Sequence, residues 1–539
     1  MLKKLFLCTM FALMIPFLLL GANGYIEGKI VDVKTGEPLS AANVILEGTS
    51  IGSVSDIEGW YKIIDVPEGD YTVSVKFIGY ETVSKKVKVT AGKKVRLNFK
   101  LKSVALELSA LEILASRADK STPVAYSNVR KEEIELRLGS QDIPMVLNTT
   151  PSVYSTQQGG GAGDARVNVR GFNQRNVAVM INGVPINDME NGWVYWSNWD
   201  GVADATSSIQ MQRGLSAVNL ATPSIGGTMN IITDPTARNR GGIFKQEYGD
   251  GNFLKSTLNF NSGMIGDKLA LSGTVVRKIG DGVIDKTWTD AWAYYFGASY
   301  QANKNNRFEL FAIGAPQRHG QSSYKQNAAA FSHEFAKDEL GYSQDALDAF
   351  PEAEAGRYYN ENWSPVSSDY KGQQYFYMYG DKTVDRHDPN YLNERENYYH
   401  KPQVNFNWYL TLNEKMRLST VAYFSGGSGG GSGPFDDMVW DYSGPSRVID
   451  YDATIANNVG SVNRKGNDKT EGLSVAYLRN SVNRQWTLGT ISKFYYKLNE
   501  NLTLQTGIDW RTAEIKHFRE VRDLLGGEYA VNGNYDPYG

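Results

Sequence analysis

The stretch from Val404 to Asn413, V-N-F-N-W-Y-L-T-L-N, decides the fold class because apolar and polar residues alternate along it. Successive side chains of a strand point to opposite faces, so one face of this segment is apolar and the other is polar. The segment from Leu502 to Arg511 repeats the pattern. The chain of 539 residues contains 54 Gly, 32 Tyr and 11 Trp, a composition that favours strands over helical bundles. We therefore expect a mostly β protein.

The connections between the alternating segments favour a transmembrane antiparallel β-barrel over a soluble sandwich, which would show the same alternation. If the first strand runs outward from about Gly242, the short turns fall on the periplasmic side and the long segments fall outside. Outer-membrane barrels segregate their connections in this way. The short turns are expected at 266–268, 304–306, 413–415 and 499–501, and the longer segments at about 280–291, 318–401 and 425–470.

The first 24 residues have the composition of a cleaved secretory signal peptide. Lys3 and Lys4 precede an apolar stretch over 5–20, and small residues up to Gly24 follow. A retained membrane anchor is the alternative. The single cysteine, Cys8, lies in this segment, which excludes disulfide frameworks and cysteine-built metal sites from the rest of the chain. A net charge of −3 excludes the basic field that a nucleic-acid partner would require.

Residues 25–102 alternate in short runs separated by turn residues, a pattern typical of a small antiparallel β-sandwich. The motifs Gly28–Asp32, Ser55–Tyr61 and Pro67–Tyr71 resemble, in this order, the carboxypeptidase regulatory-like domain. That domain commonly precedes transporters in the outer membrane of Bacteroidetes.

Residues 121–236 show mixed helix and strand patterns and resemble the plug domain of TonB-dependent outer-membrane receptors. The resemblance rests on four motifs in sequence: Arg166–Phe172, Val179–Pro185, Ile209–Gly214 and Gly226–Thr233. The glycine cluster at 159–163 lacks the Gly-Lys-Ser/Thr of a phosphate-binding loop and is interpreted as a flexible loop. A mixed α/β plug domain is then followed over 237–539 by part of a barrel.

The barrel expected in 237–539 has about nine strands, whereas a barrel that holds a plug has on the order of 22. The sequence also stops at Gly539 without the aromatic terminal strand usual for such barrels. We therefore expect this sequence to be the N-terminal part of a longer receptor.

The plug motifs contain residues with expected structural roles. The resemblance implies that Arg170 and Arg213 face acidic groups on the inner barrel wall, because a buried charge without a partner is costly. The pairs Asn182–Gly183 and Gly226–Gly227 are expected at turns that need positive φ angles. Gly171 and Gly214, which follow the two arginines, complete the structural set.

An aromatic run at 191–200, N-G-W-V-Y-W-S-N-W-D, is the candidate ligand surface. In related receptors the loops after the R-G-F and N-G-V-P motifs form the apex of the plug and face the outer pocket. Exposed rings stack on sugars, aryl siderophores or corrinoids; the alternative is that they pack against barrel loops. The candidate ligand residues are Asn173, Gln174, Arg175, Trp193, Tyr195 and Trp196.

A linker at 103–120 contains a candidate TonB box, Glu112, Ile113, Leu114, Ala115 and Ser116. In this family the box pairs as an added strand with the energy-coupling protein TonB, through main-chain hydrogen bonds. The alternative is a linker helix over 106–114. Leu114 and Ala115 depart from the valines usual in the box, which leaves its register open.

Signatures of enzymes and metal sites are not found in the sequence. Gly426–Gly430 matches G-x-S-x-G only within a run of glycine and serine, without the strand–turn–helix setting of a nucleophile elbow. No two of the five histidines stand at the i, i+4 spacing of a helical zinc site. We expect no catalytic residue, no metal and no cofactor.

The resemblance implies TonB-dependent active import of a scarce nutrient, such as a siderophore, cobalamin or an oligosaccharide, across the bacterial outer membrane. Glycan import of the SusC-like kind is an alternative, although R-V-N-V-R-G-F lacks the I-R-I-R-G-x-x-S pattern. A surface adhesin, a porin-like barrel and a secreted sugar-binding β protein are others. The expected partners are a TonB-type protein, outer-membrane lipid and the ligand; the resemblance also allows a surface lipoprotein lid, and nucleic acid is not expected.

Overall fold

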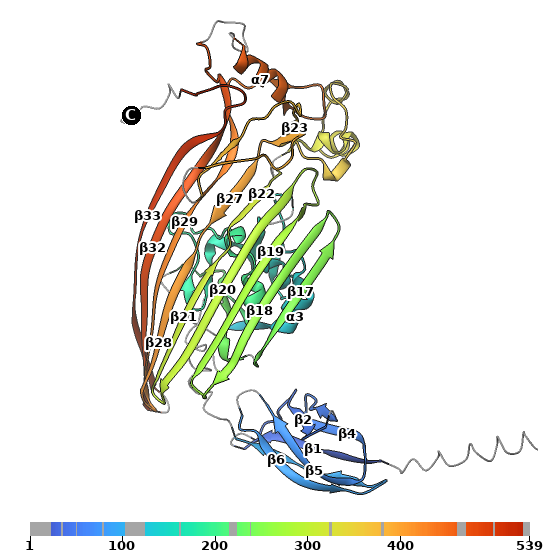
Figure 1. The fold of residues 1–539 in the computed structure, drawn as a ribbon, viewed down its shortest axis with the longest axis vertical. Helices are drawn as coiled ribbons and strands as arrows, with labels where there is room; N and C mark the ends of the chain where they lie inside the picture. The colour runs from blue at the N-terminus through green and yellow to red at the C-terminus, as the bar shows by residue number, and fades with distance from the viewer. Residues whose placement is uncertain are drawn as a thin grey trace, which may run out of the picture. The chain divides into compact units, whose positions relative to one another are not determined.

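The chain divides into two compact units, Met1–Glu112 and Ile113–Gly539. The structure is a computed structural model (Figure 1). It describes residues 23–33, 36–49, 51–77, 80–102, 124–160, 163–214, 222, 224–237, 239–322, 326–378, 382–460, 470–499 and 502–531.

The first unit is a β-sandwich whose two sheets enclose one hydrophobic core. Core residues alternate with more exposed ones along the strands, as in β1, where Ile26 and Ile30 are buried. One sheet has the order β4-β1-β7, with β8 also paired to β1, and the other has the order β3-β2-β5-β6. The predicted sandwich is confirmed, but it is not wholly antiparallel: β1 pairs in parallel with β7 and β8, because the chain passes through the second sheet before it returns beside β1. The strands are β1 Gly24–Asp32, β2 Asn43–Leu46, β3 Gly52–Val54, β4 Trp60–Val66, β5 Gly69–Lys76, β6 Val83–Val89, β7 Lys94–Arg96 and β8 Phe99–Leu101.

The second unit begins with a plug domain built on a five-stranded sheet of order β14-β13-β16-β15-β9, with a three-stranded sheet β10-β11-β12 beside it. The strands β13 and β16 are buried along their whole length and pair in parallel, as is typical of strands covered on both faces. Helix α3 contributes Ile134 to the same core, so the mixed α/β character is confirmed. The elements are β9 Ala125–Arg130, α3 Lys131–Leu138, η1 Ile143–Leu147, β10 Val153–Thr156, β11 Arg166–Val169, β12 Phe172–Asn173, η2 Gln174–Asn176, β13 Val177–Ile181, β14 Val184–Pro185, η3 Trp196–Trp199, α4 Val202–Ala205, β15 Ser208–Arg213, β16 Gly227–Ile232 and η4 Pro235–Ala237.

A curved antiparallel sheet, the barrel wall, follows the plug and covers it (Figure 1). Within the described residues it has eleven strands, of which β22 continues β21 and β27 continues β28, so the chain passes along it nine times. The passes lie in the order β17-β18-β19-β20-β21-β28-β29-β32-β33, and their number agrees with the count predicted from the sequence. The strands are β17 Gly241–Gly249, β18 Phe253–Ile265, β19 Leu269–Asp281, β20 Trp288–Asn303, β21 Asn306–Gly314, β22 Gln317–Gly320, β27 Glu396–His400, β28 Gln403–Asn413, β29 Met416–Asp436, β32 Ala476–Asn499 and β33 Leu502–Asp523.

Connections at the two ends of the wall differ in length. The four predicted short turns join β18 to β19, β20 to β21, β28 to β29 and β32 to β33 at one end. The long connections, which lie at the other end, carry the helices α5 His333–Asp338, α6 Gln344–Leu347 and α7 Tyr451–Val459. The predicted segregation has one exception: β17 and β18 are joined at the long-loop end by a short turn. Gly251 and Asn252 have φ angles of 68° and 54° there, which permits a tight hairpin.

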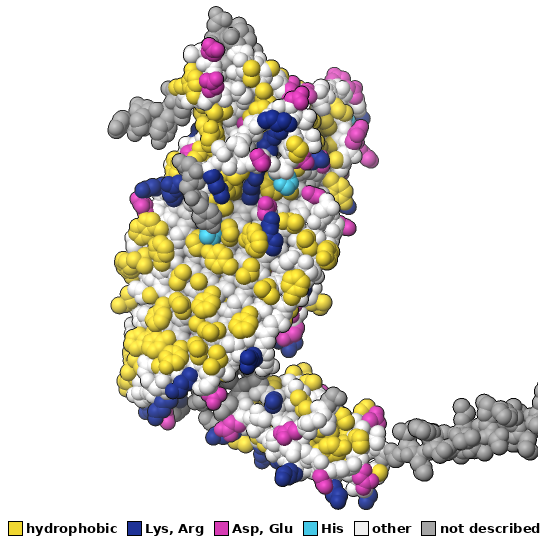
Figure 2. All heavy atoms as spheres, in the orientation of Figure 1, with side chains coloured by type: hydrophobic (Ala, Val, Ile, Leu, Met, Phe, Trp, Pro, Cys, Tyr) yellow, Lys and Arg dark blue, Asp and Glu magenta, His cyan; other side chains and the backbone are white. Residues whose placement is uncertain are grey.

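The outer face of the wall is apolar and its inner face is polar, as predicted. On β28, Val404 is 45 % exposed whereas Asn405 is 1 % exposed. Figure 2 shows hydrophobic side chains in a broad band over the wall. The inner face packs on the plug, since Phe311 and Ile313 of β21 belong to the plug's own core cluster. The polar face therefore meets a plug domain instead of a second sheet, which favours the barrel over a soluble sandwich.

Helices of the described residues are short or polar. None of them is both long enough and apolar enough to cross a membrane.

Candidate functional site

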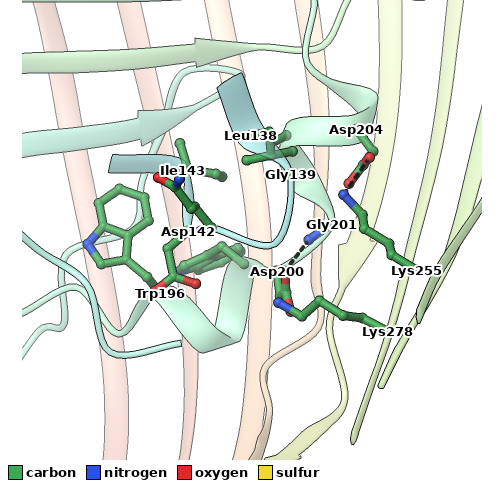
Figure 3. A pocket seen from close by; sticks show the side chains of 13 residues that line it. Leu138, Gly139, Asp142, Ile143, Trp196, Asp200, Gly201, Asp204, Lys255 and Lys278 are labelled. Carbon is green, nitrogen blue, oxygen red and sulfur yellow. Dashed lines mark hydrogen bonds and ion pairs between the residues drawn. The ribbon is translucent and has the colours of Figure 1, made fainter. Parts of the chain in front are cut away.

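Two buried ion pairs join the plug to the barrel wall (Figure 3). Asp204 lies in α4, and its Oδ1 is 2.9 Å from Nζ of Lys255 on β18. Asp200 lies just before α4, and its Oδ2 is 2.5 Å from Nζ of Lys278 on β19. The side chains of Lys255 and Lys278 are 4 % and 3 % exposed. Both lysines point inward, and both contact the same short segment of the plug.

The two lysines are direct cross-strand partners in the β18–β19 ladder. Like charges directly opposite each other destabilise a sheet. Asp200 and Asp204 offset this repulsion by placing one carboxylate on each ammonium group. Glu247 of β17 also lies near Lys255, with its Oε2 3.7 Å from Nζ, so the charge balance at this point comes from both the plug and the wall.

Asp142 adds a third carboxylate to the cluster. Its two oxygens accept hydrogen bonds from the backbone N–H groups of Gly163 and Ala165, at 3.0 Å each. Burial raises the pKa of Asp142 to about 6, against the attraction of Lys278. A cavity with room for about one water molecule lies among the three carboxylates and the two lysines, as Figure 3 shows.

The two paired carboxylates differ in proton affinity. Burial raises the pKa of each, because it disfavours the charged form. For Asp200, the ammonium of Lys278 outweighs burial and holds the pKa below its usual range. For Asp204, burial together with repulsion from Asp200 and Glu247 outweighs the attraction of Lys255, so its pKa is raised. Asp200 is therefore the more firmly charged of the two.

Sequence reasoning did not identify this cluster, although the alternation of the strands could have indicated its two lysines. Lys255 shares its inward phase with Thr257, and Lys278 shares its phase with Thr274. A lysine on the polar, inward phase of a wall strand requires an acidic partner from inside the barrel. The position of that partner, near Asp200, depends on the packing of the plug and is not visible in the sequence.

Arg170 and Arg213, which were expected to face acids on the wall, make no ion pair within the described part of the chain. Nη1 of Arg213 donates to the carbonyl oxygen of Pro151, inside the plug itself. Arg170 is exposed and occupies a turn with a φ angle of 52°. The structure corrects the polarity of the contact: the plug supplies the acids and the wall supplies the bases.

Of the four residues expected to need positive φ angles, Asn182, Gly183 and Gly227 have them, Gly227 as the first residue of β16, and Gly226 does not. Gly226 has no positive φ, because it serves a close approach instead of a turn. A Cβ atom there would lie 2.8 Å from Cβ of Phe172. Positive φ angles occur at Gly171, Asn182, Gly183, Gly214 and Gly227.

The exposed part of the candidate ligand surface is centred on Trp193, whose ring contacts two guanidinium groups. The Cζ atoms of Arg166 and Arg175 each lie 4.8 Å from its centroid. Tyr195 is 41 % exposed, and Asn173 is exposed at the start of η2, where its Oδ1 accepts the backbone N–H of Arg175. The surface offers two cations, an indole ring and a phenol to an incoming molecule. Arg166 was not among the sequence candidates.

Gln174 and Trp196 do not lie on this surface, which corrects the expectation that they touch ligand. They are 1 % and 2 % exposed. Nε1 of Trp196 donates to Oε1 of Gln174, and Nε2 of Gln174 donates to the carbonyl oxygen of Val194. Their polar groups are hydrogen-bonded inside the plug, so these two residues hold the aromatic run at 191–200 in place from the buried side.

The plug residues before the aromatic run contact wall strands that are distant from β18 in the sheet order. Oε2 of Glu190 lies 2.7 Å from Nε2 of His517 on β33. Val184 of β14 packs against Val421, Tyr423 and Ile491 of β29 and β32. The plug is thus held on two sides of the wall.

Several candidate segments lie outside the described residues. They are the candidate TonB box Glu112–Ser116 with the linker around it and most of the signal peptide, and they stay predictions. Within the residues that are described, no group of three or more His, Cys, Asp or Glu side chains could hold a metal ion.

Comparisons with known domain families match two segments of the chain. Residues 26–113 match the CarboxypepD_reg-like domain, and residues 118–228 match the TonB-dependent Receptor Plug Domain.

Similar proteins include receptors and transporters. The TonB-dependent receptor P39 of Formosa agariphila is 26 % identical over 40 % of this chain and 20 % of its own length. The vitamin B12 transporter BtuB of Vibrio vulnificus is 24 % identical over 44 % of this chain and 34 % of its own length. The TonB-dependent receptor SusC of Bacteroides thetaiotaomicron is 27 % identical over 39 % of this chain and 19 % of its own length. The aligned part of this chain thus spans about a third or less of these relatives.

Solved structures similar to the chain include the unliganded ferric citrate transporter FecA, with a TM-score of 0.46, 12 % identity and coverage of 74 % of this chain and 50 % of that one. Another is P. aeruginosa FpvA, with a TM-score of 0.44, 13 % identity and coverage of 75 % and 54 %. With a CarboxypepD_reg-like domain, a plug domain and a wall of β-barrel strands, and with TonB-dependent receptors and SusC among its relatives, the chain is consistent with a TonB-dependent receptor.

Proposed function

We propose that this chain is the plug-bearing part of a receptor that imports a scarce nutrient across the bacterial outer membrane by TonB-dependent active transport. The observation that carries the proposal is the buried contact between plug and wall. Lys255 and Lys278 meet Asp204 and Asp200 inside the barrel, so the plug fills the space through which a ligand would pass. Its relatives include a vitamin B12 transporter and a SusC receptor.

The outer membrane has no ATP. The energy that moves the plug must therefore come from a partner protein on the periplasmic side. The candidate box Glu112–Ser116 supplies an extended segment that a TonB-type partner can pair with as an added strand. Tension on this segment acts on the plug, whose ion pairs to the wall are the contacts that must break. Separating these buried pairs leaves charges without their partners, and this cost opposes opening of the plug.

Ligand recognition is assigned to the exposed surface around Trp193 and Tyr195, with Arg166, Arg175 and Asn173. Guanidinium groups attract anions, and exposed rings stack on flat or sugar-like groups. Siderophores, corrinoids and acidic oligosaccharides all have one or both of these features. Glycan import of the SusC kind is the second candidate, favoured by the SusC receptor among the relatives.

Partners in the proposal are the TonB-type protein in the periplasm, outer-membrane lipid on the apolar outer face of the wall, the ligand, and a surface lipoprotein lid where the ligand is a glycan. A signal peptide over 1–24 directs export and is cleaved. No enzymatic step and no cofactor are part of the mechanism.

Growth of a deletion strain tests the proposal and sorts the ligand classes. The strain is grown with limiting ferric siderophore, with limiting cobalamin, or with a single oligosaccharide as carbon source, and complemented with the intact gene or with a gene lacking the codons for 112–116. Import predicts a growth defect on one of these sources that the intact gene alone repairs. Equal repair by both genes would favour a passive porin-like barrel. Normal growth of the deletion strain on every source would leave an adhesin as the better explanation.

A further inference from the structure

The outer face of one sheet in the N-terminal sandwich is both cationic and aromatic. We call the outward residues of β4, β1, β7 and β8 the cationic face. Alternation along the strands places their side chains together, because the inward positions of the same strands form the buried core. The charged and aromatic residues of the cationic face are Tyr25, Glu27, Lys29, Trp60, Lys62, Asp65, Lys94, Arg96 and Lys100, and its apolar residues are Val31 and Ile64.

Charges on this face are unbalanced. Among its described residues there are five cations and two carboxylates, those of Glu27 and Asp65. Glu27 is directly opposite Lys62 on one side and Arg96 on the other, and its Oε1 lies 2.6 Å from Nζ of Lys94. The hydrogen bond from Lys94, with the charges of Lys62 and Arg96, holds the pKa of Glu27 below its usual range. Glu27 is therefore ionised and paired, and five cations against two carboxylates leave a positive surplus.

The aromatic rings are interleaved with these cations. Nζ of Lys29 and Cζ of Arg96 lie 5.6 and 5.2 Å from the centroid of Trp60. Nζ of Lys62 lies 4.5 Å from the centroid of Tyr25. Both rings are only partly buried. A molecule that approaches the cationic face thus meets positive charge and ring surface at the same place.

The opposite sheet of the sandwich has no such combination. The outward residues of β5 and β6 include Lys86 and Lys88, and they pair directly with Thr72 and Asp70. None of the outward residues described on these two strands is aromatic. Lysines on β6, an edge strand, are explained by protection of a free sheet edge, whereas the interleaved rings of the cationic face are not.

We propose that the cationic face binds the peptidoglycan of the cell wall. Free carboxylates of the peptide stems match the lysines and Arg96, and the sugar rings of the glycan match the faces of Trp60 and Tyr25. The inference rests on the proposed function, in which the segment before the plug lies in the periplasm beside the cell wall. An anionic lipid surface is the other occupant to test, because Trp and Tyr rings also lie at the level of lipid headgroups.

Cosedimentation with purified sacculi tests the proposal, because sacculi are insoluble in detergent and the full chain can be used. The test variant combines Lys62→Gln with Arg96→Gln. The matched control combines Lys86→Gln with Lys88→Gln, which changes the net charge equally on the opposite sheet. Both pairs are exposed, and glutamine places no like charge opposite Glu27 or Asp70, so neither variant should disturb the fold.

We expect the test variant to bind sacculi about tenfold more weakly than the parent chain, and the control to bind like the parent. Trp60→Ala should also weaken binding several-fold, and salt should weaken binding of the parent. Equal losses in test variant and control would mean diffuse charge attraction and overturn the proposal. Unchanged binding by Trp60→Ala would overturn the sugar contact, and absent binding to sacculi together with binding to vesicles of anionic lipid would favour a lipid surface. Binding to sacculi needs neither the imported ligand nor an energy source. The cosedimentation result and the growth test can therefore fail independently of each other.

Discussion

Removing one member of the Asp200–Lys278 pair should loosen the plug far more than removing both. Lys278 is 3 % exposed and stands opposite Lys255, so the change Asp200→Asn leaves two adjacent ammonium groups with one close carboxylate from the plug. Breaking a buried ion pair from one side typically costs about 3–5 kcal/mol. The change Lys278→Met on its own leaves Asp200 buried and unpaired at a similar cost. With both changes no unpaired charge remains, and most of the cost should disappear.

Thiol labelling can measure the opening of the plug. The mature chain is expected to lack cysteine, since Cys8 lies in the signal peptide. Ala203→Cys therefore supplies a unique probe in α4, at a position that is 4 % exposed. If the thiol reacts only when the plug opens, a cost of about 3–5 kcal/mol raises the labelling rate by roughly two to four orders of magnitude.

The double variant decides the outcome. Combined with the probe, Asp200→Asn and Lys278→Met together should label within about tenfold of the parent. Glu514→Gln, which breaks an exposed pair with Lys516 on the same wall, is the control and should leave the rate unchanged. If the double variant labels as fast as the single ones, the loss does not come from an unpaired charge. If the single variants label like the parent, the pair does not hold the plug.

Four further changes have defined outcomes. Burial raises the pKa of Asp142 to about 6 from its usual 3.8, so its ionisation opposes packing by up to about 3 kcal/mol as the pH rises from 4 to 7; the free energy of plug opening, measured by urea titration, should carry this decrease, and Asp142→Asn should remove it. Trp196→Ala should lower that free energy by about 3–5 kcal/mol, whereas Trp193→Ala with Tyr195→Ala should leave it unchanged and weaken ligand binding at least about tenfold; equal free energies for both would contradict the burial assignment. Deletion of 112–116 should abolish uptake of labelled ligand but not its binding to whole cells, and full uptake would place the box elsewhere. Gly227→Ala places a Cβ 2.2 Å from the carbonyl oxygen of Gln212 and should prevent stable folding, whereas Gly171→Ala, in open space at positive φ, should lower the free energy measured by urea titration by only about 1 kcal/mol.

The wall could be predicted from the sequence because its determinants are local. A strand with one face in lipid and one face on a polar interior shows a period of two, and short turns between such strands carry their own residue signals. The breaks between β21 and β22 and between β27 and β28 were missed, although each contains a proline, Pro316 or Pro402. Proline lacks the N–H that a ladder needs, so these two residues were a readable signal.

The candidate site could be predicted only in part, because it depends on contacts between distant segments. Trp193 and Trp196 are three residues apart in one aromatic run, yet one is partly exposed and the other is buried. The difference comes from Gln174, which binds Trp196 from another loop. Composition identified the run, but it could not separate the rings that face outward from the ring that packs inward.

Spacing explains why so short a plug segment can balance both lysines. Neighbouring strands lie about 4.8 Å apart, and this distance sets the separation of Lys255 from Lys278. Asp204 lies within α4, and Asp200 lies two residues before the helix, where its Oδ1 accepts a hydrogen bond from the backbone N–H of Gly201. Since the sheet ladder fixes the two lysines and one short plug segment carries both carboxylates, a shift of this segment by about one strand residue, ~3.3 Å, would strain both pairs together. The plug contact should therefore release in one step under tension, and not one pair at a time.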